Sequence, residues 1–174
     1  MMKYVALLRG INVGGRIIKM SDLQAIFESL GLEHVSTVLQ TGNVLFSSGG
    51  SLDVLVNVIE TSLTKAFDYP AKVQVVSMKF LQGAVEAYPF NVSVDTYQNY
   101  VIFFEDGLER VLAAEGRNLD TSIEQIALGD GVLYWHVPKG QTLKSPFAQY
   151  LTMAKYKSFH TNRNINSLQK ILAA

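Results

Sequence analysis

The chain has 174 residues, which is enough for one sizeable hydrophobic core or for two small halves that share an interface. Its 15 Lys and Arg residues balance its 15 Asp and Glu residues, and this zero net charge argues against nonspecific nucleic-acid binding, which needs an excess of cations. The absence of cysteine excludes disulfides, thiolate nucleophiles and cysteine metal sites.

Hydrophobic residues make up 48% of the chain and charged residues 17%, below the roughly 25% that is usual in soluble domains. This composition indicates very complete burial or an apolar surface that a second copy covers, so a homodimer is one expected arrangement. The amino terminus has too short an apolar run for a signal peptide, and the longest uncharged stretch, residues 35–52, is too polar to cross a membrane. We therefore expect a cytoplasmic protein with no membrane partner.

The first half of the chain predicts the element order βαββαβ. Residues 4–8 are apolar at every position, which is typical of a central strand covered on both faces. A helix then begins at a capping box, with Ser21 at the N-cap and Gln24 three residues later, and ends at Gly31. The further elements are strands over 35–39 and 44–47 around the turn 40–43, a helix over 52–67 and a strand over 73–76.

The second half predicts a shorter version of the same order. A connecting helix over 78–88 is followed by a strand over 100–104, a helix over 108–115, a hairpin of strands over 123–128 and 132–137, and a helix from residue 146. The expected N-caps are Asp106 for the helix at 108 and Ser145, followed by Pro146, for the later helix. Residues 156–163 are polar and predict an irregular tail before a last short helix. The order is therefore βαββα.

We predict an α+β protein built from two ferredoxin-like halves, βαββαβ and βαββα. The halves agree in the order of their elements and not in their residues, which indicates a structural duplication. The expected boundaries are an N-terminal half over 1–77, a connecting helix and loop over 78–99, a C-terminal half over 100–155, and a tail with a short helix over 156–174.

The loop after the first strand, residues 9–20, is the strongest candidate for a ligand site. Its glycines expose backbone N–H groups, three cations accompany them, and a helix N-terminus with its partial positive charge follows. The spacing fits neither a P-loop nor a dinucleotide fingerprint, so the loop predicts an anion cradle without identifying the anion. Two other interpretations stay open: the glycines only turn the chain while Arg9 pairs with a carboxylate, or the loop contacts a partner protein.

Strand order places a second turn beside this loop. In a βαββαβ sheet the first two strands run the same way and the third lies antiparallel between them. The loop 9–20 should therefore share one edge with the turn 40–43, and residues 68–70 should lie nearby. In this hypothesis arginines supply charge, glycine N–H groups donate and amide side chains orient the ligand. The candidates are Arg9, Asn12, Gly14, Gly15, Arg16, Lys19, Gln40, Thr41 and Asn43.

The same blocks resemble a known bacterial family. Residues 3–15, the pair Lys19-Met20 and residues 40–46 resemble the family known as domain of unknown function 1697. The resemblance implies two related α+β halves and a bacterial cytoplasmic source, and it implies no particular activity.

Two further segments bear on that resemblance. Residues 161–168 resemble the family's closing arginine–asparagine motif, with Ile165 in place of the usual tryptophan. The resemblance therefore adds Arg163 and Asn164 as candidate contributors to the ligand site. Where the family tends to show a Ser-Lys pair after a glycine, this chain has Lys144-Ser145 in reverse order, so no role is carried over to that pair.

The sequence gives no positive sign of a metal site, a serine nucleophile or a pair of catalytic carboxylates. The three histidines, His34, His136 and His160, are not paired at metal-ligand spacing, so no metal site is predicted. No serine sits in a nucleophile elbow, and the adjacent acids Glu105 and Asp106 are explained more simply by helix capping. Catalytic residues and cofactors therefore remain unknown.

Two functional hypotheses follow. The first is a protein that binds a phosphate- or carboxylate-bearing small molecule or nucleotide at residues 9–20 and 40–43, with catalysis left open. The alternative is a non-enzymatic module that binds RNA or a protein through a sheet face, as RNA-recognition domains do with exposed aromatics on their first and third strands. Tyr4 and Phe46 occupy such strands, but the basic, glycine-flanked pattern is missing and core packing explains both equally well.

Overall fold

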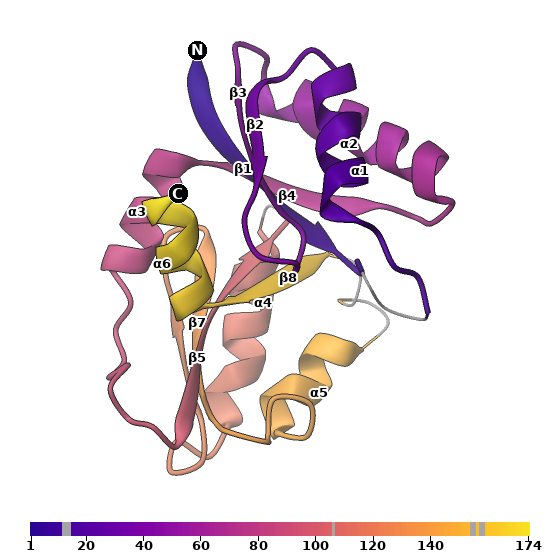
Figure 1. Cartoon of the computed structure of the whole chain (residues 1–174). Helices are drawn as coiled ribbons and strands as arrows, with labels where there is room; N and C mark the ends of the chain where they lie inside the picture. The colour runs from indigo at the N-terminus through magenta and orange to yellow at the C-terminus, as the bar shows by residue number, and fades with distance from the viewer. Residues whose placement is uncertain (12–14, 106, 154–155, 157–158) are drawn as a thin grey trace. The chain divides into compact units, whose positions relative to one another are not determined.

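The computed structural model describes residues 1–11, 15–105, 107–153, 156 and 159–174. The chain forms two compact units, shown in Figure 1. Unit 1 comprises Met1–Leu81 with Lys170–Ala174, and unit 2 comprises Gln82–Gln169. None of the helices in the described ranges combines the length and hydrophobicity that a membrane span requires.

Unit 1 contains one antiparallel sheet and two helices that cover it. Its elements are β1 (Met2–Arg9), α1 (Met20–Ser29), β2 (Glu33–Thr37), β3 (Asn43–Ser48), α2 (Leu52–Phe67), β4 (Lys72–Ser77) and the start of α3 (Met78–Glu86). The strand order is β2-β3-β1-β4, the ferredoxin-like order that the sequence predicts. Both helices lie on one face of the sheet (Figure 1), because α1 and α2 share a single core cluster with alternate residues of the strands.

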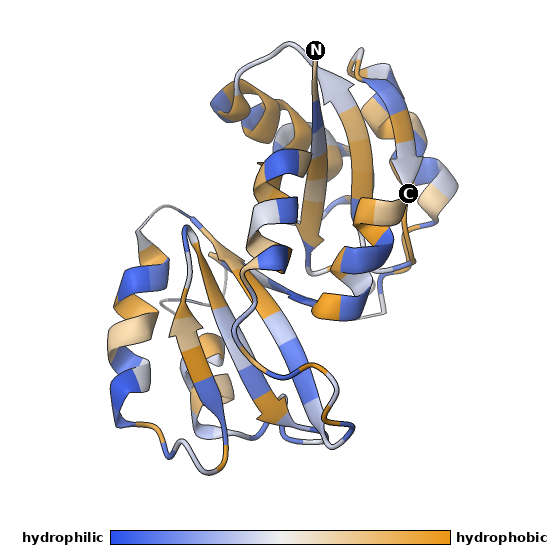
Figure 2. Ribbon diagram, turned by 90° about the vertical axis from the view of Figure 1, so that its left-hand side faces the viewer, coloured by the Kyte–Doolittle hydropathy of each residue, from blue (hydrophilic) through white to orange (hydrophobic). Residues whose placement is uncertain are grey.

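Unit 2 repeats this topology in full. Its elements are the end of α3, β5 (Tyr97–Phe104), α4 (Leu108–Glu115), the 3₁₀ turn η1 (Gly116–Asn118), β6 (Gln125–Leu128), β7 (Val132–Pro138), α5 (Pro146–Thr152), β8 (His160–Asn164) and most of α6 (Ile165–Ala173). The strand order β6-β7-β5-β8 matches that of unit 1 strand for strand. Figure 2 shows hydrophilic and hydrophobic residues alternating around the helices, as expected where one helix face packs on a sheet.

The prediction of an irregular tail over 156–163 is wrong for residues 160–163. His160–Asn164 forms β8, which pairs antiparallel with β5 from Phe104↔His160 to Tyr100↔Asn164. The strand has no aliphatic or aromatic hydrocarbon residue, so hydrophobic periodicity could not reveal it. Unit 2 is therefore βαββαβ and not one strand short.

Two capping predictions have different outcomes, and a third is untested. Ser145 is the N-cap of α5 as predicted, because its hydroxyl accepts a hydrogen bond from the Ala148 N–H. Helix α1 instead begins at Met20 with Lys19 as its N-cap, so Ser21 lies inside the first turn and makes no cap. Asp106 lies outside the described residues.

The aromatic residues that an RNA-binding sheet would present are buried in unit 1. Tyr4 and Phe46 belong to the core beneath α1 and α2, with ring centroids 5.7 Å apart. They cannot stack on bases without removing that core.

Candidate functional site

Three segments of unit 1 meet at the end of the sheet where β1 stops. We define the rim as residues 9–11, 15–20, 38–43 and 68–71. The Leu8 N–H donates to the Gly42 carbonyl at 2.8 Å, which joins β1 to the turn. Arg16 Nη2 donates to the Asp68 carbonyl at 3.5 Å, which joins the loop to the segment before β4. The loop and the turn lie at one edge, as the strand order predicts, because Ile11 lies against Gly42 and residues 17–20 line one pocket with Gln40.

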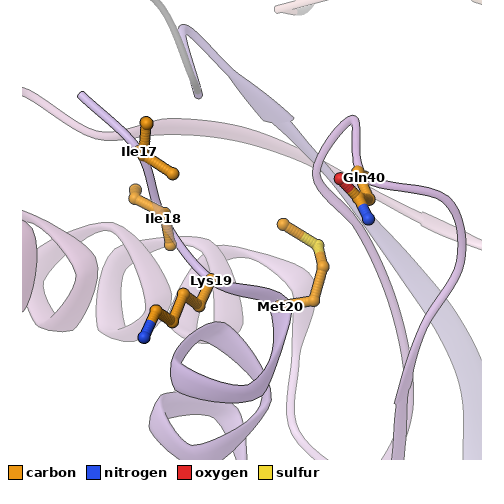
Figure 3. Close-up of a pocket in the computed structure, with 5 residues that line it drawn as sticks. All are labelled: Ile17, Ile18, Lys19, Met20 and Gln40. Carbon is orange, nitrogen blue, oxygen red and sulfur yellow. The ribbon is translucent and has the colours of Figure 1, made fainter. Parts of the chain in front are cut away.

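A pocket of about 300 Å³ opens in this rim. The residues that line it are Ile17, Ile18, Lys19, Met20 and Gln40. In Figure 3 the Met20 side chain extends from the start of α1 toward Gln40, whereas the Lys19 side chain extends away from Gln40. The exposed Lys19 ammonium sits on a flexible stem, so a bound anion is within its reach only after a change of rotamer.

The N-terminus of α1 forms part of the pocket wall. The backbone of Lys19 is extended, and its carbonyl accepts from the N–H groups of Asp22 and Leu23, which starts the helix. The Lys19 side chain makes no capping hydrogen bond. Two of the first-turn N–H groups thus donate to the Lys19 carbonyl, and those of Met20 and Ser21, with the partial positive charge of the helix end, are left for an anion at this pocket.

Arg16, which precedes the pocket residue Ile17 and does not itself line the pocket, packs on an aromatic ring. Its guanidinium carbon lies 4.6 Å from the centroid of the Tyr69 ring, in a cation–π contact. Tyr69 is only 5% exposed, and its hydroxyl has no hydrogen-bond partner among the described residues. Burial raises the pKa of Tyr69, while the Arg16 charge opposes that rise. The guanidinium has five donors, so its hydrogen bond to Asp68 leaves most of them for a ligand.

The turn that carries Gln40 is closed by a buried amide. Asn43 Nδ2 donates to the Val38 carbonyl at 3.0 Å and to Thr41 Oγ1 at 2.9 Å. Leu39 has a φ of 60°, an unusual value for a leucine, and Gly42 has a φ of 81°. A rigid turn of this kind fixes the backbone from which Gln40 reaches the pocket.

Two predicted site residues lie elsewhere on the sheet. Leu8 faces the core beneath the helices, so Arg9 next to it faces the opposite side, and Asn43 is paired with Leu7 on that same side. Neither residue lines the pocket. Asn43 is fully buried and Arg9 is half-buried, and burial lowers the pKa of Arg9. Asn43 therefore shapes the turn and is not placed for direct ligand contact.

The remaining candidates are distributed as follows. Asn12 and Gly14 lie outside the described residues, and Gly15 is exposed with a φ of 78°. Thr41 is exposed at the rim and accepts from Asn43.

Arg163 and Asn164 belong to β8 of unit 2. Burial lowers the pKa of Arg163 to about 10, and its Nη1 donates to Thr161 Oγ1 at 2.6 Å and to the Asn162 carbonyl at 2.9 Å. Asn164 Nδ2 donates to Gln98 at 2.8 Å, and its Oδ1 accepts from the Asn166 N–H at the start of α6. These contacts all lie within unit 2: the Arg163 contacts stay within β8, the Gln98 contact joins β8 to β5, and the Asn166 contact joins β8 to α6.

The apolar wall of the pocket was missed by sequence reasoning. Ile17, Ile18 and Met20 belong to the loop for which only the glycines and cations were considered. The available signal was the pair Ile17-Ile18 in a glycine-rich loop, where no predicted helix or strand required it. No group of three or more His, Asp or Glu side chains in the described part of the chain is placed to bind a metal.

Comparison with known proteins settles the family. A family model described as protein of unknown function DUF1697 matches residues 1–134. The chain belongs to this family. The match includes the whole rim and ends within β7, and it confirms the resemblance seen in the sequence. No curated protein matches this DUF1697 member.

A solved bacterial structure resembles the chain in fold. A structure described as conserved bacterial protein SP0830 from Streptococcus pneumoniae is 26% identical, with a TM-score of 0.81, covering 99% of this chain and 97% of its own. An unknown protein from Galdieria sulphuraria is 13% identical with a TM-score of 0.28, covering 94% of this chain and 96% of its own, which is too distant to carry an argument. SP0830 therefore supports the two-unit α+β fold for the DUF1697 chain.

Proposed function

We propose that this DUF1697 protein binds a small molecule carrying a phosphate or carboxylate at the rim of unit 1. The observation that carries the proposal is the pocket of about 300 Å³ between the N-terminus of α1 and Gln40. The N–H groups of Met20 and Ser21 receive the anion, Arg16 and Lys19 supply positive charge, and the Gln40 amide orients the ligand.

The charge distribution supports an anion over a cation. Residues 9–20 contain three cations and no Asp or Glu. The cation–π contact holds Arg16 in place, which lowers the entropy that a ligand must remove when it binds this guanidinium. Asp22 in the first turn of α1 is exposed and is the acidic residue nearest in sequence to the pocket wall.

At a second helix, α5, a side chain of the protein itself accepts hydrogen bonds from donors at the N-terminus, so no ligand is needed there. At α5, Glu124 is almost completely buried, and its carboxylate accepts from the Phe147 N–H at 3.3 Å and from Ser145 Oγ at 3.0 Å. The chain thus supplies its own anion there. Helices α2 and α4, like α1, have no side-chain cap, so the adjacent pocket and cations distinguish α1.

Thermal unfolding of the full chain with inorganic phosphate and with adenosine 5′-monophosphate tests the proposal. An anion at a hundredfold excess over its dissociation constant should stabilise the protein by about 2.7 kcal/mol. Lys19→Ala should weaken binding up to about fivefold, because an exposed charge pair is worth at most about 1 kcal/mol. Lys144→Ala, which removes an exposed lysine from unit 2, is the matched control and should leave binding unchanged. The proposal fails if neither anion raises the unfolding temperature.

A further inference from the structure

The pocket at the rim has an apolar wall that protein folding does not explain. Ile17 is 84% exposed, the highest value among the large hydrophobic side chains of the described residues. Its neighbour Ile18 is buried in the core of unit 1 and anchors this part of the loop. Ile17 therefore adds almost nothing to the core, yet it lines the pocket.

The apolar wall of the pocket also includes Met20, the first residue of α1. Met20 is half-buried and extends toward Gln40 across the pocket (Figure 3). A methionine thioether packs well against aromatic rings, and its unbranched chain adapts to the shape of a ligand. Gln40 adds one donor group and one acceptor on the facing wall. The pocket thus combines an anion-binding end with an apolar surface and an amide.

We infer that the ligand is an organic anion whose apolar or aromatic body packs on Ile17 and Met20, and that Ile17 determines this preference. The inference rests on the proposed anion-binding function and narrows its ligand class. Covering an exposed isoleucine recovers roughly 1.5–3 kcal/mol when burial is complete, which corresponds to a factor of ten or more in affinity.

The volume limits the size of the ligand. Ligand pockets usually measure about 300–1,000 Å³, and this one lies at the lower end of that range. It accommodates a single ring system with one anionic group, as in an aryl phosphate or an aromatic carboxylate.

Calorimetry with paired anions on the full chain tests the inference. Phenyl phosphate should bind at least tenfold more tightly than inorganic phosphate, and Ile17→Ser should remove that advantage while leaving the affinity for inorganic phosphate unchanged. The same comparison of benzoate with acetate distinguishes a carboxylate ligand from a phosphate ligand. Leu143→Ser is the matched control, because Leu143 is 82% exposed in unit 2 and does not line the pocket.

The outcomes separate the two proposals. If none of the four anions binds, the proposed function fails and this inference fails with it. If the simple anions bind but the aromatic ones bind no more tightly, or if Ile17→Ser has no effect on the difference, only the inference fails. A loss that Leu143→Ser reproduces would also overturn it.

Discussion

Units 1 and 2 have the same strand order but connect their first strand and helix with different loops. Residues 10–19 join β1 to α1, whereas residues 105–107 are enough to join β5 to α4. The long loop contains two cations and no acid. The short loop and the hairpin at the corresponding end of unit 2 contain Glu105, Asp106 and Asp130. The ferredoxin-like scaffold therefore allows either sign of charge at this edge, and the candidate site is a property of the inserted loop and not of the topology.

The largest expected effect is a loss of stability in unit 2 when the buried carboxylate of Glu124 at the N-terminus of α5 is removed. Glu124 accepts hydrogen bonds from three buried donors: Trp135 Nε1 at 2.9 Å, Ser145 Oγ and the Phe147 N–H. Glu124→Ala should lower the free energy of unfolding by about 4 kcal/mol, because each buried donor left without a partner costs about 1–3 kcal/mol. Denaturant unfolding followed by the fluorescence of Trp135, the single tryptophan, measures this loss within unit 2.

Glu124→Gln is the control for that change. The amide keeps an acceptor oxygen of the same shape, so the loss should be about half as large. Equal losses for the two variants would mean that charge, and not the number of acceptors, stabilises the start of α5. A loss below about 1 kcal/mol for Glu124→Ala would mean that water replaces the carboxylate, and the contrast between α5 and α1 would lose its basis.

The second-largest expected effect is the loss of stability caused by a side chain at Gly42, in the turn 40–43 of unit 1. At Gly42, a Cβ would lie 2.8 Å from Ile11 Cγ2 and 3.0 Å from Leu8 Cβ, and φ is 81°. Gly42→Ala should therefore cost about 3 kcal/mol, the sum of backbone strain and overpacking. Gly140 in unit 2 has a φ of 83° but nothing within 4 Å of its Cβ position, so Gly140→Ala should cost only the strain, about 1 kcal/mol. Chemical denaturation of both variants gives the difference, and equal costs would mean that Ile11 yields to the new methyl group.

Sequence reasoning recovered most of the fold because most elements bury a periodic apolar face. The apolar spacing of α2 and the uninterrupted apolar run of β1 predicted both elements within two residues of their observed bounds. Strand β8 had no such signal, since its residues are polar and its pairing with β5 is a long-range contact. A local sequence pattern cannot predict that a polar segment pairs with a strand far away in the sequence.

The candidate site was predicted less completely than the fold. Strand order correctly placed the loop beside the turn, because that adjacency follows from topology alone. It did not tell on which side of the sheet each residue lies, so Arg9 and Asn43 were grouped with Gln40 although alternation along the strands separates them. The exposure of Ile17 was missed for a different reason: a loop has no periodicity from which exposure can be predicted, and only the pair Ile17-Ile18 signalled an apolar surface there.

The smallest effect concerns Asp22, the acid nearest in sequence to the pocket wall, and sharpens the contrast between the α1 and α5 N-termini. Asp22 lies in the first turn of α1 and is exposed, whereas Glu124 is buried against α5. Asp22→Asn should raise the affinity for inorganic phosphate about twofold to fivefold, because it removes a like charge near the anion, while it slightly weakens the helix. Asp53→Asn, in the first turn of α2, should weaken its helix similarly and leave phosphate binding unchanged. Isothermal titration and thermal unfolding of both variants separate the two effects. If the two variants change phosphate affinity equally, the anion does not bind at α1, and the rim of unit 1 differs from that of unit 2 only in its net charge.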